Sequence, residues 1–250
     1  MIPKISVIIP AFNAEDFLNE SVSSVLKQTY KNFELIIVDD SSTDKTKEIA
    51  KRFAESDERV KIITNKINRK RAGSINRGIK FSSGEFITFL DADDKYLNKT
   101  LEMQYSFMRK NPKIDMIYGA TKFFGFENGR TTPLNLIGLD LRKLLLERKK
   151  LDLSTKTPGQ FFGIGGGIAS CSVMIKRNVF KKCKFDEKLR NSEDYDLWFQ
   201  IIGKGFKVKA LDKILYLYRT HDGQKSKNKK NMDDARNTIL KKLKRGVYFK

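Results

Sequence analysis

The first ninety residues of the chain alternate short apolar runs with segments of helical periodicity. The apolar runs are rich in β-branched residues and cover residues 5–9, 33–38, 60–64 and 85–90. Apolar residues recur at helical spacing over residues 14–28, 45–56 and 72–81. Strands and helices that alternate in this way, with nearly continuous apolar strands, predict a parallel sheet covered by helices on both faces. The expected fold class is therefore α/β.

The pattern becomes less regular after residue 116. Ser42 is expected to cap the helix over residues 45–56. Further on, we expect strands over residues 116–124, 171–175 and 214–218, helices over residues 140–150 and from residue 192, and a glycine-rich loop at residues 163–167. This half is expected to extend the same sheet and to complete its cleft. We therefore expect one domain over residues 1–222 and a basic C-terminal tail over residues 223–250.

Polar and acidic residues follow three of the predicted strands. They are Pro10 to Asn13, Asp39-Asp40 and Asp91-Ala92-Asp93. Because ligands of such sheets bind beyond the carboxyl ends of the strands, these segments are expected to face one cleft. Asp91 and Asp93 can chelate a hard divalent cation and leave coordination positions for phosphate oxygens. The alternative is a solvated acidic turn that begins a helix. With Asp94 they form three close carboxylates, which raise one another's pKa unless a cation lies among them.

Four ordered segments resemble the motifs of one enzyme family. They are SVIIPAFNAEDFL (6–18), IIVDDSSTDKT (36–46), FLDADD (89–94) and NSEDYDLWFQI (191–201). Together they resemble the inverting family 2 glycosyltransferases over roughly residues 4–222. The resemblance implies the GT-A fold, a single Rossmann-like mixed sheet that is mostly parallel and flanked by helices. It also implies transfer of a sugar from a UDP-sugar, less often a dTDP-sugar, to an acceptor hydroxyl with inversion and with Mn²⁺ or Mg²⁺.

The resemblance assigns donor-binding roles in the first half of the chain. Asp39 would accept a hydrogen bond from the ring N–H of uracil, with a turn or helix-capping aspartate as the alternative. Asp91 would face the ribose or a metal-bound water, and Asp93 would bind the metal that bridges the two phosphates. The other positions matched to nucleotide contacts are Pro10, Ala11, Phe12, Asn13, Glu15, Asn68, Asn76 and Ala92.

The same resemblance assigns the acceptor side to the last motif. Asp194 matches the catalytic base, and its place at a helix start is expected to hold its pKa low. Glu193, on the acceptor side, and Asp196 are its structural competitors. Trp198 either packs under the acceptor sugar or lies in the core. His221, the only histidine, is a metal ligand, a diphosphate contact or a surface residue.

The segment after Asn68 departs from the family pattern. Relatives carry a glycine-containing loop there, followed by an arginine where this chain has Ile75, whereas this chain has Arg69-Lys70-Arg71. Either Arg71 or Arg77 takes the role of that arginine, or the loop serves another purpose.

Charge and cysteine content bound the remaining function classes. The chain has 50 Lys+Arg against 30 Asp+Glu, a net charge of +20, with lysine clusters at residues 225–230 and 241–245. This segment is either a solvated tail or a basic amphipathic segment that lies on an anionic membrane. The alternative functions are therefore a basic nucleic-acid or anionic-surface binding protein, or a catalytically inactive sugar-nucleotide binder. No recognised nucleic-acid motif occurs, so nucleic acid is not expected as a partner.

The compartment and the partners follow from the same features. Cys171 and Cys183 lack the spacing of a metal site, which indicates ordinary thiols in a reducing compartment. The N-terminus leads directly into a predicted strand, without the features of a signal peptide. We expect a cytoplasmic protein, or one held peripherally at the inner face of the membrane, that acts in cell-surface glycan or polysaccharide synthesis. Its expected acceptor is a lipid-linked glycan, another glycan or a protein.

Overall fold

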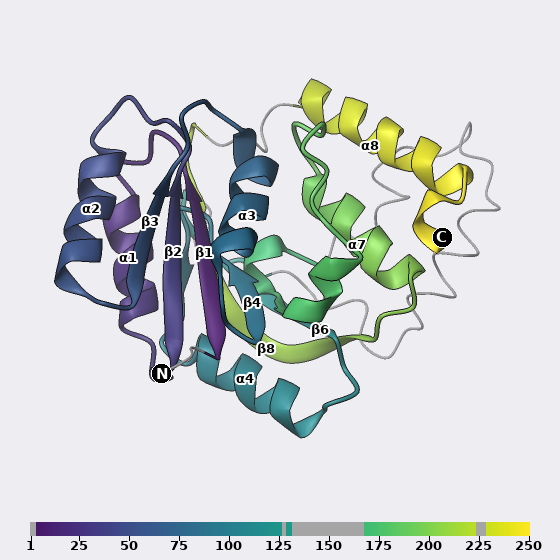
Figure 1. Cartoon of the computed structure of the whole chain (residues 1–250), viewed down its shortest axis with the longest axis horizontal. Helices are drawn as coiled ribbons and strands as arrows, with labels where there is room; N and C mark the ends of the chain where they lie inside the picture. Colours follow the sequence, from purple (N-terminus) through teal and green to yellow (C-terminus); the bar gives the residue numbers. More distant parts are fainter. Residues whose placement is uncertain (1–3, 127–128, 132–167, 224–228) are drawn as a thin grey trace.

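Eight strands form one mixed sheet (Figure 1). The computed structural model describes residues 4–126, 129–131, 168–223 and 229–250. The strands are β1 (Ile5–Ala11), β2 (Phe33–Asp39), β3 (Val60–Thr64), β4 (Phe86–Phe89), β5 (Lys95–Tyr96), β6 (Met116–Gly125), β7 (Met174–Lys176) and β8 (Val208–Thr220). Their order across the sheet is β3-β2-β1-β4-β7-β6-β8-β5.

The sheet is parallel at one side and mixed at the other. Strand β1 lies between β2 and β4 and is parallel to both, and β3 is parallel to β2. Strand β7 runs antiparallel between β4 and β6, β8 is parallel to β6, and β5 is antiparallel to β8. Parallel pairings thus outnumber antiparallel ones among the described strands. The expected α/β class, with one mixed and mostly parallel sheet, is confirmed.

Helices cover both faces of this sheet, and the core has two layers. The helices are α1 (Leu18–Leu26), α2 (Thr46–Ser56), α3 (Lys70–Phe81), α4 (Thr100–Lys110), α7 (Glu193–Gly203) and α8 (Lys229–Lys244). Ile8 of β1 packs in the layer that holds α3, α7 and α8, whereas Val7 and Ile9 pack in the layer that holds α1, α2 and α4. Successive side chains of a strand point to opposite faces, so a strand buried on both faces must be apolar throughout.

Strand β1 continues through Pro10 to Ala11 and does not end at residue 9. Pro10 pairs with Val38 of β2, but the pairing of β1 with β4 ends at Ile8 and Phe89. The last residues of β1 therefore form a local edge, where the missing N–H of a proline is tolerated. This extension carries the β1 backbone to the rim of the sheet.

Several other boundaries differ from the sequence pattern. Helix α2 begins at Thr46, whose N–H donates to Asp44 Oδ1 at 3.0 Å, so Ser42 is not its cap. The strand expected over residues 171–175 is a short 3-10 turn, Ser170–Ser172, followed by β7. Strand β5 and helix α4 were not predicted. The helix expected over residues 140–150 and the glycine-rich residues 163–167 lie outside the described part of the chain.

The C-terminal segment packs on the core and is not a solvated tail. Helix α8 presents a buried apolar stripe to the layer that contains α7, because an amphipathic helix covers a core with one face. Lys241 and Lys244, on its other face, are exposed. The buried residues of the segment are Ala235, Ile239, Leu240, Leu243 and Tyr248. The boundary at residue 222 stays a prediction. Among the described helices, none combines the length and the apolar character that a membrane span requires.

Candidate active site

A cavity of about 680 Å³ lies at the carboxyl ends of β1 and β4 and reaches the first turn of α7. This is the edge of the sheet where the sequence predicted a ligand site. The structure brings most of the predicted site residues together here, from segments far apart in the chain. Those in the lining are Pro10, Ala11, Phe12, Asn13, Asn68, Asp91, Ala92, Asp93, Glu193, Asp194 and His221.

Two predicted residues lie away from this cavity. Trp198 is fully buried and its Nε1 donates to the carbonyl of Ile168 at 3.1 Å, so it belongs to the core and does not face an acceptor. Asn76 donates through Nδ2 to the carbonyl of Phe185 at 2.9 Å and to Glu187 Oε1 at 3.0 Å. It therefore connects α3 to the segment before α7 and has no place in the cavity lining. Both side chains satisfy their polar groups within the fold.

Glu15 and Asp39 also lie outside the lining, where they stabilise the loops at its rim. Glu15 Oε2 accepts a backbone N–H of the loop after β2 at 2.9 Å. Asp39 is 1% exposed, and its Oδ1 accepts the N–H of Ser42 at 3.2 Å. Asn13 Oδ1 accepts the N–H of Thr43 at 2.9 Å, so the loops after β1 and β2 are bonded to each other. Recognition of a base by Asp39 stays a prediction.

Arg71 is the cation among the carboxylates. Its Nε donates to Asp91 Oδ1 at 2.7 Å, its Nη1 to Glu193 Oε1 at 3.2 Å and its Nη2 to Ser170 Oγ at 2.6 Å. Although burial opposes the change, the Asp91 and Glu193 carboxylates raise the pKa of Arg71 well above its ordinary value. The planar guanidinium suits such a fork of contacts. One side chain in the first turn of α3 thus joins the two predicted halves of the site.

The end of β8 and the residue that follows it supply further contacts to Asp93 and Asp94. His221 Nε2 lies 3.1 Å from Asp93 Oδ2, which brings the predicted histidine and the predicted metal ligand together. Arg219 donates its backbone N–H to Asp94 Oδ1 at 2.8 Å and its Nε to the carbonyl of Asp93 at 2.8 Å. These bonds fix the backbone of the acidic turn, whereas the Asp93 carboxylate faces the cavity. The metal role of His221 stays a prediction.

The turn that carries Asp91, Asp93 and Asp94 has too little positive charge around it to offset its three carboxylates. Burial and the Asp91 carboxylate raise the pKa of Asp93. Burial, followed by the Asp93 and Asp91 carboxylates, raises the pKa of Asp94 well above its ordinary value. Asp94 Oδ2 is buried and has no hydrogen-bond partner among the described residues. A cation bound in the cavity beside Asp93 would offset this excess of carboxylates.

The donor set at Asp93 fits a hard divalent cation better than the neighbouring cluster does. Asp93 and His221 offer an oxygen and a nitrogen, which suit Mn²⁺, and the carboxylate suits Mg²⁺. Asp91, Asp94 and Cys171 also place ligand atoms within 4.8 Å of one another. However, burial raises the pKa of the Cys171 thiol well above its ordinary value, and a protonated thiol is a poor ligand.

Asp194 lies in the first turn of α7 and lines the cavity. Burial and the Glu193 carboxylate raise its pKa to about 7, although Arg71 lowers it. The expectation of a low pKa is therefore wrong. A helix dipole contributes about 0.3–1 kcal/mol at a helix end, less than one pKa unit, so it does not offset the loss of hydration. A carboxylate with a pKa near neutrality is suited to general base catalysis.

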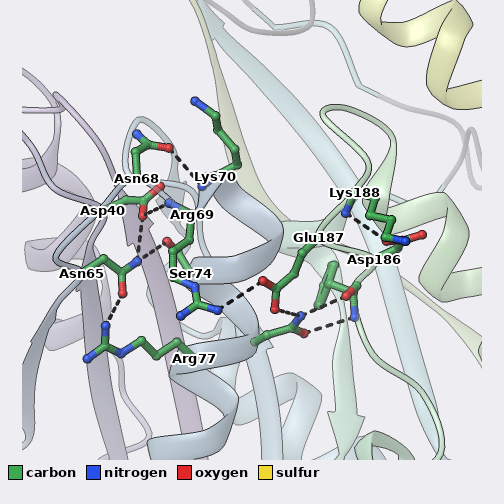
Figure 2. A network of polar contacts seen from close by, with 12 residues as sticks. Asp40, Asn65, Asn68, Arg69, Lys70, Ser74, Arg77, Asp186, Glu187 and Lys188 are labelled. Carbon is green, nitrogen blue, oxygen red and sulfur yellow. Dashed lines mark hydrogen bonds and ion pairs between the residues drawn. The ribbon is translucent and has the colours of Figure 1, made fainter.

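Asp40 stabilises the loop that leads into α3, the helix that carries Arg71. Its Oδ1 accepts Asn65 Nδ2 at 2.7 Å and the N–H of Arg69 at 2.7 Å (Figure 2). Arg77 Nη1 donates to Asn65 Oδ1 at 2.6 Å, so Arg77 supports the loop from outside the cavity. Of the two arginines proposed for this role, Arg71 is the one that lines the cavity. The sequence marked Asp39-Asp40 as facing the cleft. It did not predict that Asp40 would stabilise the loop before α3.

The second half of the chain supplies a wall that sequence reasoning missed. Its side chains are aromatic, cationic and apolar, and two of them come from α8, the segment predicted to be a tail. Apart from Tyr195, which lies in the motif at residues 191–201, no local motif marks them, because their segments converge only in the folded chain. They are Phe123, Arg190, Tyr195, Tyr216, Tyr218, Met232 and Arg236.

Comparisons with solved structures agree with this architecture. The crystal structure of S. aureus TarS 1-349 in complex with UDP has a TM-score of 0.69 and 24% identity, over 87% of this chain and 60% of that chain. The mannosyltransferase PcManGT from Pyrobaculum calidifontis, in complex with GDP-Man and Mn²⁺, has a TM-score of 0.64 and 14% identity, over 99% of this chain and 74% of that chain. These likenesses confirm the expected GT-A fold.

Comparisons of sequence extend the similarity to the family level. An Escherichia coli protein named UDP-Glc:alpha-D-GlcNAc-diphosphoundecaprenol beta-1,3-glucosyltransferase WfgD is 34% identical over 227 residues, which are 90% of this chain and 80% of that protein. Residues 6–183 match the family model described as Glycosyl transferase family 2. The match covers Asp91 to Asp94, the first turn of α3 with Arg71 and most of the sheet, and the chain belongs to glycosyl transferase family 2.

Proposed function

We propose that this protein transfers a sugar from a UDP-sugar to an acceptor hydroxyl with inversion at the anomeric carbon. The observation that carries the proposal is the shared cavity. Asp93 and His221 lie at one part of it and Asp194 at another, with Arg71 bonded to carboxylates of both parts. A donor diphosphate and an acceptor hydroxyl need such groups on either side of the reacting carbon.

The donor is proposed to carry uridine. The names of WfgD and of the TarS complex include UDP-Glc and UDP, which supports this choice, although PcManGT was solved with GDP-Man. A dTDP-sugar is the second choice, because thymine has the same ring N–H for Asp39 to accept. The segment Pro10 to Asn13 would contact the nucleotide, since it lines the cavity at the end of β1.

Asp93, with His221, is proposed to hold Mn²⁺ or Mg²⁺. Their geometry and the excess of carboxylates around them support this assignment. When bound, the cation supplies positive charge that stabilises the departing nucleoside diphosphate. Arg71 would add a fixed positive charge beside the same part of the donor, because it lines the cavity next to Asp91.

Asp194 is proposed as the base. Its carboxylate would take the proton of the acceptor hydroxyl as that oxygen bonds to the anomeric carbon from the face opposite the diphosphate. The carbon–oxygen bond to the diphosphate breaks, and its electron pair leaves with the diphosphate. Glu193 is a weaker candidate because it is bonded to Arg71, and Asp196 because it is fully buried. The products are an inverted glycoside and UDP.

A lipid-linked glycan is proposed as the acceptor, ahead of another glycan or a protein. The acceptor in the name of WfgD is a sugar on diphosphoundecaprenol, and Arg190 and Arg236 line this cavity, where they would favour an anionic acceptor. The exposed Lys244 and Arg245 would face anionic lipid at the inner membrane surface. The proposed role is therefore cell-surface polysaccharide synthesis at that surface.

Transfer assays with a panel of nucleotide sugars and Mn²⁺ test the proposal. We expect UDP release that depends on acceptor, and its loss in Asp194→Asn with the UDP-induced rise in Tm retained. Glu58→Gln, which removes an exposed acid outside the cavity lining, should behave as wild type. Full transfer by Asp194→Asn would refute the base. UDP binding without transfer or hydrolysis in wild type would instead support an inactive sugar-nucleotide binder.

A further inference from the structure

The C-terminal segment is bonded to the helix that carries Asp194. Asp196, in the same first turn of α7, is fully buried. Its Oδ1 accepts Lys242 Nζ at 2.7 Å and the hydroxyl of Tyr248 at 2.6 Å, and its Oδ2 accepts Gln200 Nε2 at 2.7 Å. Two of the three donors come from residues that follow α7 by about forty positions or more.

Lys242 also bonds the segment that leads into α7. Its Nζ donates to Asp186 Oδ2 at 2.6 Å as well as to Asp196. Asp186 precedes the helix and Asp196 lies in its first turn, so one ammonium group joins the segment before α7 to the first turn of α7. Both carboxylates contribute to raising the pKa of Lys242, although burial opposes the rise. Lys242 therefore forms an ion pair with Asp186 and another with Asp196.

Tyr248 holds the far end of the same helix. Its ring packs edge-on against Phe199, with centroids 5.7 Å apart. At Gly203, the last residue of α7, an added Cβ would collide with the carbonyl oxygen of Tyr248. The 3-10 turn Val247–Phe249 thus lies directly on α7, next to helix α8 (Figure 1). The first turn and the last turn of α7 are both restrained by the C-terminus.

Helix α8 also contributes to the cavity itself. Met232 and Arg236 line it together with Asp194 and Tyr195. The same element therefore forms part of the wall proposed for the acceptor and is fixed to the helix of the proposed base. A segment needed only to cover the core would require apolar contacts, but the bonds to Asp196 are specific to one buried carboxylate.

We infer that Lys242 and Tyr248 are positioning residues, which act through Asp196 to hold Asp194 in the geometry for proton transfer. The inference rests on the proposed function. A buried carboxylate keeps one orientation when its oxygens are paired, and loses it when a partner is removed. Because Asp194 and Asp196 share one helical turn, a shift of the turn moves the proposed base relative to the acceptor. A displacement of about 1 Å can lower a rate roughly 100-fold.

Steady-state kinetics of four variants test the inference. Lys242→Met should lower kcat about tenfold or more with the donor KM within about twofold of wild type. Lys242→Arg should recover most of kcat, because it keeps the charge and the donors. Tyr248→Phe, which removes one hydroxyl and leaves the ring packing intact, should lower kcat by a smaller factor. Lys241→Met is the matched control, since Lys241 is exposed and makes no contact with Asp196.

Amide hydrogen exchange at residues 193–203 reads the positioning without requiring transfer. Faster exchange there in Lys242→Met and Tyr248→Phe than in Lys241→Met supports the inference, and equal exchange overturns it. Wild-type kcat in folded Lys242→Met and Tyr248→Phe also overturns it. If Lys242→Met fails to fold, Tyr248→Phe decides by the same two measurements. A wild-type protein that transfers no sugar refutes the proposed function alone, because the exchange comparison still stands.

Discussion

At the scale of single residues, the charge balance of the cavity depends on Arg71. The guanidinium bonds to Asp91, Glu193 and Ser170 at once, and Glu193 is 7% exposed. A lysine has one compact ammonium group and cannot reproduce this planar fork. The arginine therefore sets both the pairing of the buried carboxylates and the distance between the two parts of the site.

Replacement of Arg71 tests this balance. Arg71→Lys should fold but lose roughly ten- to a hundredfold in kcat, and Arg71→Ala should lower the free energy of unfolding by about 3–5 kcal/mol because Glu193 is left without its partner. Urea unfolding and transfer assays measure the two effects. Arg69→Lys is the matched control, because Arg69 contacts Glu187 at 3.4 Å in an exposed pair worth at most about 1 kcal/mol. An Arg71→Ala variant as stable as wild type would contradict this account.

The raised pKa of Asp194 gives a pH dependence with a definite sign. The proposed base must be ionised, so kcat/KM should rise with pH and level off above about 7. For stability the sign is opposite. Because the folded-state pKa lies above the unfolded value, the folded state binds more protons, and the contribution of Asp194 to stability falls as pH rises from about 4 to about 7.

A comparison of wild type with Asp194→Asn isolates the pH-dependent contribution of Asp194 to the free energy of unfolding. The variant has no proton to lose at this position, so its free energy of unfolding relative to wild type should increase steadily over the same pH range. Urea unfolding at several pH values measures the difference. A constant difference across the range would mean that the carboxyl is ionised throughout, as a helix N-terminus alone would favour.

At the scale of elements, the sequence predicted what depends on local pattern. Strand β3 was predicted at its observed bounds, Val60–Thr64, because its short run is rich in β-branched residues, which favour strands. Strand β5 was missed because its two residues, Lys95 and Tyr96, have no periodicity and are strand only through pairing with β8. Most of the predicted site residues reached one cavity because the carboxyl ends of parallel strands share an edge.

Other features could not be read from the sequence because they depend on long-range packing. The helical spacing of Trp198 does not reveal which neighbour the side chain faces. Its place in the core is evident only from the folded chain, where it donates to the carbonyl of Ile168. The pKa of Asp194 depends on burial and on Glu193 beside it, not only on the helix end. The basic C-terminal segment was misread because its lysines outnumber the apolar residues that it buries.

Helix α8 provides a test of that correction. Ile239 is fully buried in the layer that holds α7, so Ile239→Ala should lower the free energy of unfolding by about 2–5 kcal/mol, as for other large-to-small changes in a core. Lys241→Ala, on the exposed face, should change it by no more than about 0.5 kcal/mol. Denaturant unfolding measures both. Equal stability of the two variants would restore the solvated tail.

At the scale of the whole molecule, the positive charge and the acidic cavity act on different steps. The net charge of +20 creates a long-range field that attracts anions, among them the proposed donor and the proposed lipid surface, and salt screens it beyond about 8–10 Å. The carboxylates of the cavity act only at contact distance, where they would repel a diphosphate unless cations offset them. We therefore propose that the surface charge speeds the encounter with the anionic donor, and that the groups around Asp93 hold the donor once it is bound.

Ligand binding to the whole native state should reveal that dependence on a cation. A ligand that binds only the folded protein stabilises it by about 2.7 kcal/mol at a hundredfold excess over Kd, so UDP with Mn²⁺ should raise Tm by several degrees. UDP with a chelator should raise Tm far less, because the carboxylates of Asp91 and Asp93 then face the diphosphate without compensation.

In Asp93→Asn the two conditions should give nearly the same Tm, since the cation loses its ligand. Asp16→Asn, an exposed acid outside the cavity lining, should keep the wild-type difference. An equal rise in wild type with and without the cation would mean that Arg71 and its neighbours hold the diphosphate alone, and Asp93 would lose the role proposed for it.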